Sequence, residues 1–321
     1  MAIGEFPEPH FIDTNGIRMA VYEVGEGPAV ILLHGFPELA FSWRFQLPVL
    51  AQAGYRAIAP DLRGYGQTDA PRGVEAYRID ELIADVHGLL DALGLESATF
   101  VGHDWGALLL WHMALVAPGR IESLAILNIP FHARPPADPI TLFRARLGDD
   151  FYIVNFQDSD EADRVFAADI PHFFDVMMRR DQITRERFDQ LPQEMKSLDL
   201  LAAMRRRESA GVPLLTTAER DYYVAGYARS GFTGPINWYR NWTSNWESLE
   251  GVEQRIRVPT LFIGARDDVV ISLHFIDAMK SYVDDLEIHV LDNCGHWTQQ
   301  EKPGEVNALL LDWLDRRRPG C

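Results

Sequence analysis

Residues 101–107, with the sequence VGHDWGA, constrain the fold of this chain more than any other segment. An apolar run at 98–101 precedes them, and an apolar run with helical character follows at 107–116. Glycines at positions 102 and 106 allow a sharp turn between the expected strand and the expected helix. The spacing is that of G-x-S-x-G, the nucleophile elbow, but Asp104 stands where the serine would be.

An aspartate at this position changes the chemistry that the turn can support. A serine that opens a three-membered ether, or displaces a halide from an sp3 carbon, leaves an alkyl ether that water does not readily cleave. A carboxylate that attacks the same carbon leaves an ester, which water can hydrolyse. Asp104 therefore predicts alkylation of the enzyme followed by hydrolysis, rather than ordinary acyl transfer.

Strand-like and helix-like segments alternate on both sides of this turn. The expected strands lie at 17–24, 29–33, 56–59, 98–101, 124–129, 260–264 and 287–291, and the expected helices at 43–53, 79–93, 107–116, 273–282 and 306–316. Near-unbroken apolar strands that alternate with helices are typical of a parallel sheet buried on both faces. The sequence therefore predicts an α/β protein with a mostly parallel sheet flanked by helices.

The pattern changes between about residues 130 and 251. This segment is rich in charged residues, Phe, Met and Tyr, shows helical periodicity and contains no convincing strand. We expect a core made of residues 1–130 and 251–321, and a helical insert at 131–250 that covers the core as a lid.

The composition restricts the partners of the chain. A formal net charge of −17 disfavours nucleic acid and anionic membranes as partners. The two cysteines, Cys294 and Cys321, imply no disulfide framework and fit a reducing compartment. No signal peptide and no membrane span are visible, so we expect a cytoplasmic protein. The oligomeric state stays open.

Hydrolysis of an ester on Asp104 requires backbone donors for the negative charge that develops on its carbonyl oxygen. One candidate donor is the amide of Trp105, which follows the nucleophile at the start of a helix. The other is the amide of Phe36 in the HGFP run at 34–37, directly after the 29–33 strand. We expect these two amides to form the oxyanion hole.

A base must activate the water, and in this arrangement it is a histidine late in the chain. His296 lies in the run NCGHW, just past the last expected strand, where the carboxyl ends of parallel strands converge. The carboxylate that orients it should follow the previous strand, where Asp267 and Asp268 are adjacent. Position relative to that strand and to the following Val-Val pair favours Asp267, and Asp268 is interpreted as a loop residue. The alternative loop after the 124–129 strand offers only Asn128.

An acid must protonate the leaving alkoxide, and a tyrosine from the insert suits this task. A phenol with a pKa near ~10 is protonated at neutral pH and can still give its proton to a more basic alkoxide. The insert contains five tyrosines, and composition does not choose among them: Tyr152, Tyr222, Tyr223, Tyr227 and Tyr239.

Five motifs resemble the soluble epoxide hydrolases of the α/β-hydrolase superfamily, over nearly the whole chain. They are HGFPE at 34–38, DLRGYG at 61–66, GHDWG at 102–106, GFTGPINWYRN at 231–241 and CGHW at 294–297. The resemblance implies an α/β-hydrolase fold with a helical lid, a small apolar epoxide as substrate and a vicinal diol as product. It implies no metal and no organic cofactor. By resemblance, Tyr239 is one ring-opening tyrosine, and Tyr152, in a looser match at 151–157, is the other.

Two alternatives remain at this point. A haloalkane or haloacid dehalogenase would use the same Asp, His and Asp residues, with halide-binding side chains in place of the phenols. A ligand-binding protein could keep the fold without turnover, but the intact set of Asp104, Asp267 and His296 argues against it.

Overall fold

The computed structural model describes residues 3–206, 209–270 and 273–317. Eight strands form the main sheet in the order β1-β2-β4-β3-β5-β6-β9-β10. The strands are β1 (His10–Thr14), β2 (Ile17–Val24), β3 (Ala29–Leu33), β4 (Arg56–Pro60), β5 (Ala98–His103), β6 (Ile121–Leu127), β9 (Thr260–Ala265) and β10 (Leu286–Leu291). The α/β architecture expected from the alternating pattern is confirmed.

The sheet is parallel from β4 to β10, and β2 and β1 extend it with antiparallel pairing. Every residue of β3 and β5 is buried, which explains the unbroken apolar run of β3 and the mostly apolar sequence of β5. Strand β1 is not among the predicted strands. Only two of its five residues are buried, so its sequence lacks the apolar signal of the inner strands.

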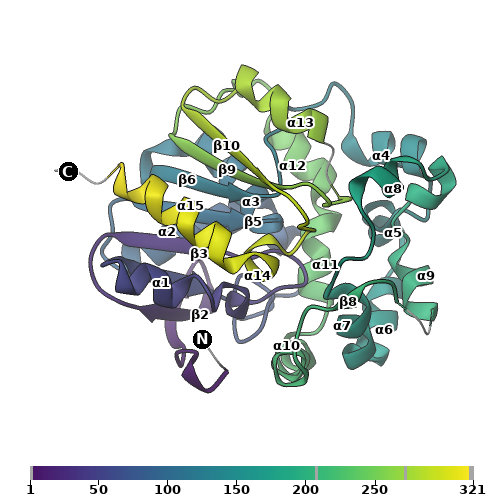
Figure 1. The fold of residues 1–321 in the computed structure, drawn as a ribbon, viewed down its shortest axis with the longest axis horizontal. Helices are drawn as coiled ribbons and strands as arrows, with labels where there is room; N and C mark the ends of the chain where they lie inside the picture. The colour runs from purple at the N-terminus through teal and green to yellow at the C-terminus, as the bar shows by residue number, and fades with distance from the viewer. Residues whose placement is uncertain (1–2, 207–208, 271–272, 318–321) are drawn as a thin grey trace.

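Helices cover both faces of this sheet. The helices of the core are α1 (Leu47–Gln52), α2 (Ile79–Ala92), α3 (Trp105–Val116), α13 (Leu273–Ala278), α14 (Thr298–Glu301) and α15 (Pro303–Asp315). In Figure 1, α1 and α15 lie in front of the strands. Helix α3 packs against β5 and β6, and this contact places the start of α3 at the carboxyl end of the sheet.

Residues between β6 and β9 form a separate group of helices beside one end of the sheet (Figure 1, teal to green). They are α4 (Pro139–Leu147), α5 (Tyr152–Asp158), α6 (Glu161–Ala168), α7 (Ile170–Met177), α8 (Arg185–Asp189), α9 (Leu200–Arg205), α10 (Thr217–Ser230), α11 (Thr233–Arg240) and α12 (Trp242–Ser248). The group also contains one antiparallel pair, β7 (Arg179–Arg180) with β8 (Val212–Pro213). Two residues per strand are too few to show alternation, which is why no strand was predicted there.

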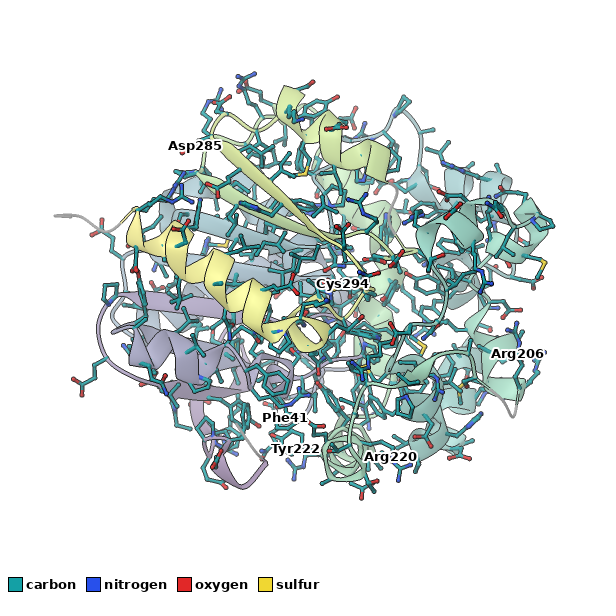
Figure 2. The ribbon with its side chains drawn as sticks, in the orientation of Figure 1. Phe41, Arg206, Arg220, Tyr222, Asp285 and Cys294 are labelled. Carbon is teal, nitrogen blue, oxygen red and sulfur yellow. The ribbon has the colours of Figure 1, made fainter. Side chains whose placement is uncertain are left out.

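Helix α10 of the insert is attached to the core by ring and ion-pair contacts. Tyr222 stacks on Phe41 with ring centroids 4.3 Å apart, and Figure 2 shows the two side chains together. The buried Arg44 pairs with Glu219 of α10 at 2.7 Å and also donates to Gln300 of the core. The insert therefore packs on the core through aromatic side chains and a partly buried ion pair.

Three further findings concern the described residues only. None of their helices has the length and apolar character needed to cross a bilayer. No group of three or more His, Cys, Asp or Glu side chains within them is arranged to hold a metal ion. Cys294 is a buried free thiol, and Cys321 lies outside the described part of the chain.

Candidate active site

Asp104 occupies a strained turn between β5 and α3. Its backbone angles are φ 50° and ψ −117°, a conformation that residues other than glycine rarely adopt. The neighbouring chain comes so close that a Cβ on Gly35 would lie 2.3 Å from Cβ of Asp104, and one on Gly106 would lie 2.1 Å from the carbonyl oxygen of Leu33. Glycine at positions 35 and 106 is therefore a requirement of this turn.

The two carboxylate oxygens of Asp104 have different surroundings. Oδ1 accepts a hydrogen bond of 2.8 Å from the amide of Phe36. Oδ2 lies 3.7 Å from Nε2 of His296, within ion-pair range but too far for a hydrogen bond. Burial raises the pKa of Asp104, but contact with His296 and the Phe36 amide outweighs burial, so the pKa lies below its ordinary value. Asp104 is therefore ionised, with Oδ2 open to a reaction partner.

The structure places Asp268, and not Asp267, against His296. Nδ1 of His296 donates to Oδ2 of Asp268 over 2.9 Å. The same oxygen accepts from Asn128, while Oδ1 of Asp268 accepts from the amide of Val270. Burial lowers the pKa of His296, but the charge of Asp268 and the contact with Asp104 outweigh burial and hold the pKa well above its ordinary value.

The prediction that Asp267 orients His296 is therefore wrong. The carboxylate of Asp267 accepts from the amide of Arg185 in the insert, at 2.8 Å, while its own amide donates to the carbonyl of Cys294. Beyond β9 the chain leaves the strand geometry, and successive side chains then point in directions that strand alternation does not predict. Asn128, on the loop that lacks a carboxylate, contributes by holding Asp268.

Polar side chains hold the backbone on both sides of His296. Glu301 accepts from the amides of Gly295 at 2.9 Å and Trp297 at 3.1 Å. His103, directly before the nucleophile, bonds the carbonyl oxygen of His296 through Nε2 at 2.8 Å. Its Nδ1 lies 2.8 Å from the fully buried carboxylate of Glu38. The position of His296 is thus set by three bonds to backbone atoms of its own loop.

Two phenols from the insert lie near enough to Asp104 to feel its charge. Tyr239 of α11 and Tyr152 of α5 have ring centroids 5.6 Å apart, and the Tyr239 ring lies 5.5 Å from that of Phe36 and 5.0 Å from that of Trp105. For both phenols, burial and the nearby charge of Asp104 raise the pKa above its ordinary value. Both side chains therefore stay protonated and can donate.

The other three tyrosines of the insert do not share this environment. Tyr222 stacks on Phe41, and the rings of Tyr223 and Tyr227 pack against Phe174. These rings contribute to packing between α10, α7 and the core. Of the five candidates, the structure brings Tyr152 and Tyr239 together beside the residues around Asp104.

Comparison with known proteins agrees with this geometry. Residues 28–303 match the family model described as alpha/beta hydrolase fold. The chain is 42% identical to Epoxide hydrolase A of Mycobacterium tuberculosis, covering 96% of this chain and 97% of the relative. The crystal structure of Epoxide Hydrolase A from Mycobacterium thermoresistibile superimposes with a TM-score of 0.86 at 40% identity, over 96% of this chain and 98% of that one.

The chain belongs to the epoxide hydrolase family of the α/β-hydrolase superfamily. Similarity extends beyond mycobacteria. The structure of potato epoxide hydrolase I has a TM-score of 0.84 at 33% identity, over 96% of this chain and 99% of that one. The pig Bifunctional epoxide hydrolase 2 is 37% identical over 95% of this chain, which spans 55% of that longer protein.

Four side chains of this candidate epoxide hydrolase site were not assigned a role from the sequence: Asp268, Glu38, His103 and Glu301. Glu38 and His103 lie inside the motifs HGFPE and GHDWG, so both could have been noticed as polar residues at buried positions. Glu301 carried no such signal, because it follows the CGHW motif on the short helix α14. Its contact with the His296 loop depends on how α14 turns back toward that loop.

Proposed function

We propose that this protein adds water to an epoxide ring and releases a vicinal diol, through an ester formed on Asp104. The observation that carries the proposal is the division of the Asp104 carboxylate into two differently held oxygens. Oδ1 is bound by the Phe36 amide, and Oδ2 faces His296 without a hydrogen bond. Oδ2 is the nucleophile in this proposal, and Oδ1 becomes the oxyanion.

In the first half-reaction, Oδ2 of Asp104 attacks a ring carbon and the carbon–oxygen bond of the epoxide breaks. The leaving oxygen receives a proton from Tyr152 or Tyr239, whose raised pKa keeps them protonated until the strongly basic alkoxide forms. The phenolate then regains a proton from His296. The products of this half-reaction are an alkyl ester on Asp104 and a neutral imidazole.

Loss of the Asp104 charge supplies the physical reason for this proton transfer. In the free protein, the carboxylates of both Asp268 and Asp104 raise the pKa of His296. Esterification neutralises one of them, so His296 binds its proton less tightly and becomes available as a base.

In the second half-reaction, neutral His296 removes a proton from water, which attacks Cγ of Asp104. The Phe36 amide stabilises the oxyanion on Oδ1. The amide of Trp105 is the second proposed donor, because it lies in the first turn of α3, where amides have no partner within the helix. Collapse of the intermediate breaks the ester carbon–oxygen bond, and the leaving alkoxide takes the proton of the new hydroxyl on Cγ, which gives the diol and the Asp104 carboxylate while His296 stays protonated.

The surroundings of the site indicate the kind of substrate. The rings of Phe36, Trp105, Phe156 and Trp242 surround Tyr239, with centroids 5.0 to 6.2 Å away. Aromatic walls favour a small apolar epoxide, while the two phenols provide the polar contacts to its oxygen. The named relatives are epoxide hydrolases, and the phenols suit protonation of an alkoxide, so dehalogenation is not favoured.

A single turnover in oxygen-18 water tests the proposal. An excess of protein should convert styrene oxide to a diol that carries unlabelled oxygen from Asp104, and the label should appear in the Asp104 carboxylate. Label that enters the diol directly would mean attack by water on the epoxide and would exclude the ester. Halide release from haloalkanes that exceeds diol formation would instead assign the protein to dehalogenation.

A further inference from the structure

The two phenols come from different helices of the insert, so their separation depends on how those helices are joined. Tyr152 is the first residue of α5, and Tyr239 is the penultimate residue of α11. A phenol that shifts by a fraction of an ångström leaves hydrogen-bonding distance of an epoxide oxygen. Something in the insert must therefore hold α5 and α11 in one arrangement.

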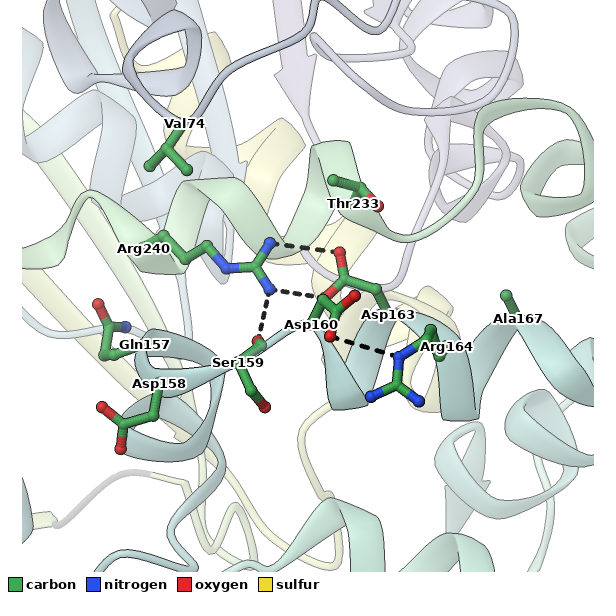
Figure 3. A pocket seen from close by; sticks show the side chains of 10 residues that line it. All are labelled: Val74, Gln157, Asp158, Ser159, Asp160, Asp163, Arg164, Ala167, Thr233 and Arg240. Atoms are coloured by element: carbon green, nitrogen blue, oxygen red, sulfur yellow. Dashed lines mark hydrogen bonds and ion pairs between the residues drawn. The ribbon is translucent and has the colours of Figure 1, made fainter.

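Arg240, the neighbour of Tyr239, uses all five donors of its guanidinium group: four reach the end of α5 and the start of α6, and the fifth returns to Asn237 within α11. Nε donates to the carbonyl of Phe156 at 3.0 Å, and Nη2 donates to the carbonyl of Ser159 at 2.9 Å. Both nitrogens Nη1 and Nη2 bond the carboxylate of Asp163, at 3.2 and 2.6 Å, and Nη1 also bonds Asn237 at 2.9 Å. Figure 3 shows Arg240 reaching Asp163 and Ser159.

The acceptors of Arg240 lie where α5 ends and α6 begins. Phe156 is in the last turn of α5, and Ser159 follows directly after it, so their carbonyls lack a partner further along the helix. A cation at this end also interacts favourably with the helix dipole. A bond that does not involve Arg240 also links α5 to α11: the side chain of Gln157 donates to the carbonyl of Tyr239 at 2.9 Å.

The ion pair is shielded and separate from the reacting groups. The side chains of Arg240 and Asp163 are 13% and 10% exposed, so neither loses its partner without leaving a largely buried charge. They line an open hollow of about 630 Å³ on the surface of the insert (Figure 3), which includes none of Asp104, Tyr152, Tyr239 and His296. Arg240 therefore contacts α5 and α6 without contacting the proposed reaction centre.

We propose that Arg240 and Asp163 are positioning residues, which hold Tyr152 and Tyr239 at the separation needed to open the epoxide. The proposal rests on the function proposed above. Its consequence is specific to one half of the reaction. The pair acts on formation of the Asp104 ester, which uses the phenols, and not on hydrolysis of that ester, which uses His296.

Variants of the pair test this consequence in single-turnover experiments. The mass of the peptide that contains Asp104 is followed after acid quench, so the rate constants for ester formation and ester hydrolysis are obtained separately. Arg240→Met and Asp163→Asn should each slow ester formation by about tenfold to a hundredfold, the cost of a small misplacement of reacting groups. Ester hydrolysis should change by less than about threefold, which is negligible on that scale.

Arg164→Met is the matched control. Arg164 lines the same hollow on α6, but its side chain pairs with Asp160, the residue directly before that helix, and both side chains are well exposed. Its replacement should leave both rate constants unchanged. An equal loss in both half-reactions for Arg240→Met, or a loss in Arg164→Met as large, would show a general weakening of the insert and would overturn the proposal.

A double-mutant cycle measures whether the effect of Arg240 on ester formation depends on the phenols. A purely structural role of Arg240 predicts no such dependence. If Arg240 acts through the pair of phenols, Arg240→Met should slow ester formation much less in a Tyr152→Phe background, which keeps a measurable rate of ester formation, than in the parent. Fully additive losses would overturn the proposal. Should Arg240→Met fail to fold by circular dichroism, Arg240→Lys and Asp163→Asn carry the same comparison. Absence of any ester or diol with the parent protein would instead contradict the proposed function itself.

Discussion

The sheet core and the helical insert hold their proposed catalytic side chains by different physical means. In the core, Asp104 is presented by backbone geometry, with a positive φ and with glycine at position 35 where a Cβ would collide with it. In the insert, Tyr152 and Tyr239 lie in regular helices and are positioned by ring contacts and by the bonds of Arg240. The first arrangement is local and stiff, while the second depends on contacts between helices far apart along the chain.

The two regions contribute to different steps of the proposed reaction. In the proposed reaction, residues of the core carry the nucleophile, the base and the oxyanion donors, whereas the insert supplies the acid that assists ring opening. Changes in the insert should therefore affect formation of the ester, and changes around His296 should affect its hydrolysis. Four predictions examine this division, beginning with the largest expected effect.

Removing both phenols should nearly abolish ester formation. Loss of one transition-state donor typically costs about 2.7–4 kcal/mol, and because Tyr152 and Tyr239 serve one oxygen, each partly replaces the other. Each single Tyr→Phe variant should be slowed moderately, and the double variant by about 10⁴-fold, with no ester accumulating on Asp104. Mass spectrometry of the intact protein checks this. A double variant that opens epoxides at the parent rate would remove the phenols from the mechanism.

Replacing His296, the proposed base, should block hydrolysis of the ester and leave its formation possible, which is the opposite of the effect of removing the phenols. His296→Gln should lower turnover by about 10³-fold, because no group removes the proton of the attacking water. Ester formation on Asp104 should persist, so an adduct of substrate mass should accumulate. Retention of turnover without an adduct would assign the base to another residue.

The two adjacent aspartates should respond differently. Asp268→Asn should slow ester hydrolysis by about 10²-fold, because the amide no longer stabilises the protonated imidazole or its correct tautomer. Asp267→Asn is the matched control, with the same chemical change one residue away, and should alter turnover by less than about threefold, as expected away from the reacting atoms. The reverse order of sensitivity would contradict the contact of Asp268 with His296.

The pH dependence of the two half-reactions should also separate them. Hydrolysis requires neutral His296, whose pKa is raised in the free protein and falls once Asp104 is esterified. Its rate should therefore decrease by about tenfold per pH unit below that lowered pKa. Ester formation requires ionised Asp104, whose pKa lies below its ordinary value, and protonated phenols, whose pKa lies above it. It should stay level over the same range, and parallel pH profiles in single turnovers would contradict the assignment.

Much of the core could be predicted from the sequence because its signals are local. Strands β2 and β3 have the expected bounds. For β3 the reason is burial on both faces, which produces a continuous apolar run. The strained turn at Asp104 was visible through its glycines. The contact between His296 and Asp268 was not, because two neighbouring aspartates in a loop have no periodicity that tells which one turns inward.

The insert was less predictable for a related reason. Its helical character followed from periodicity, but the choice of Tyr152 and Tyr239 among five tyrosines rested on family resemblance. The same composition is compatible with several packings of short helices, and only their contacts decide which phenols meet.

The sequence by itself determined the α/β class and led to Asp104 and His296 as the proposed nucleophile and base, because each follows from short-range spacing and from the chemistry of a few residues. Tertiary structure alone decided that Asp268 orients His296, that Glu301 and His103 hold its loop, and that Arg240 joins α5 to α11. These contacts form between segments distant along the chain, and their geometry depends on how whole elements pack. No local pattern in the sequence encodes that packing.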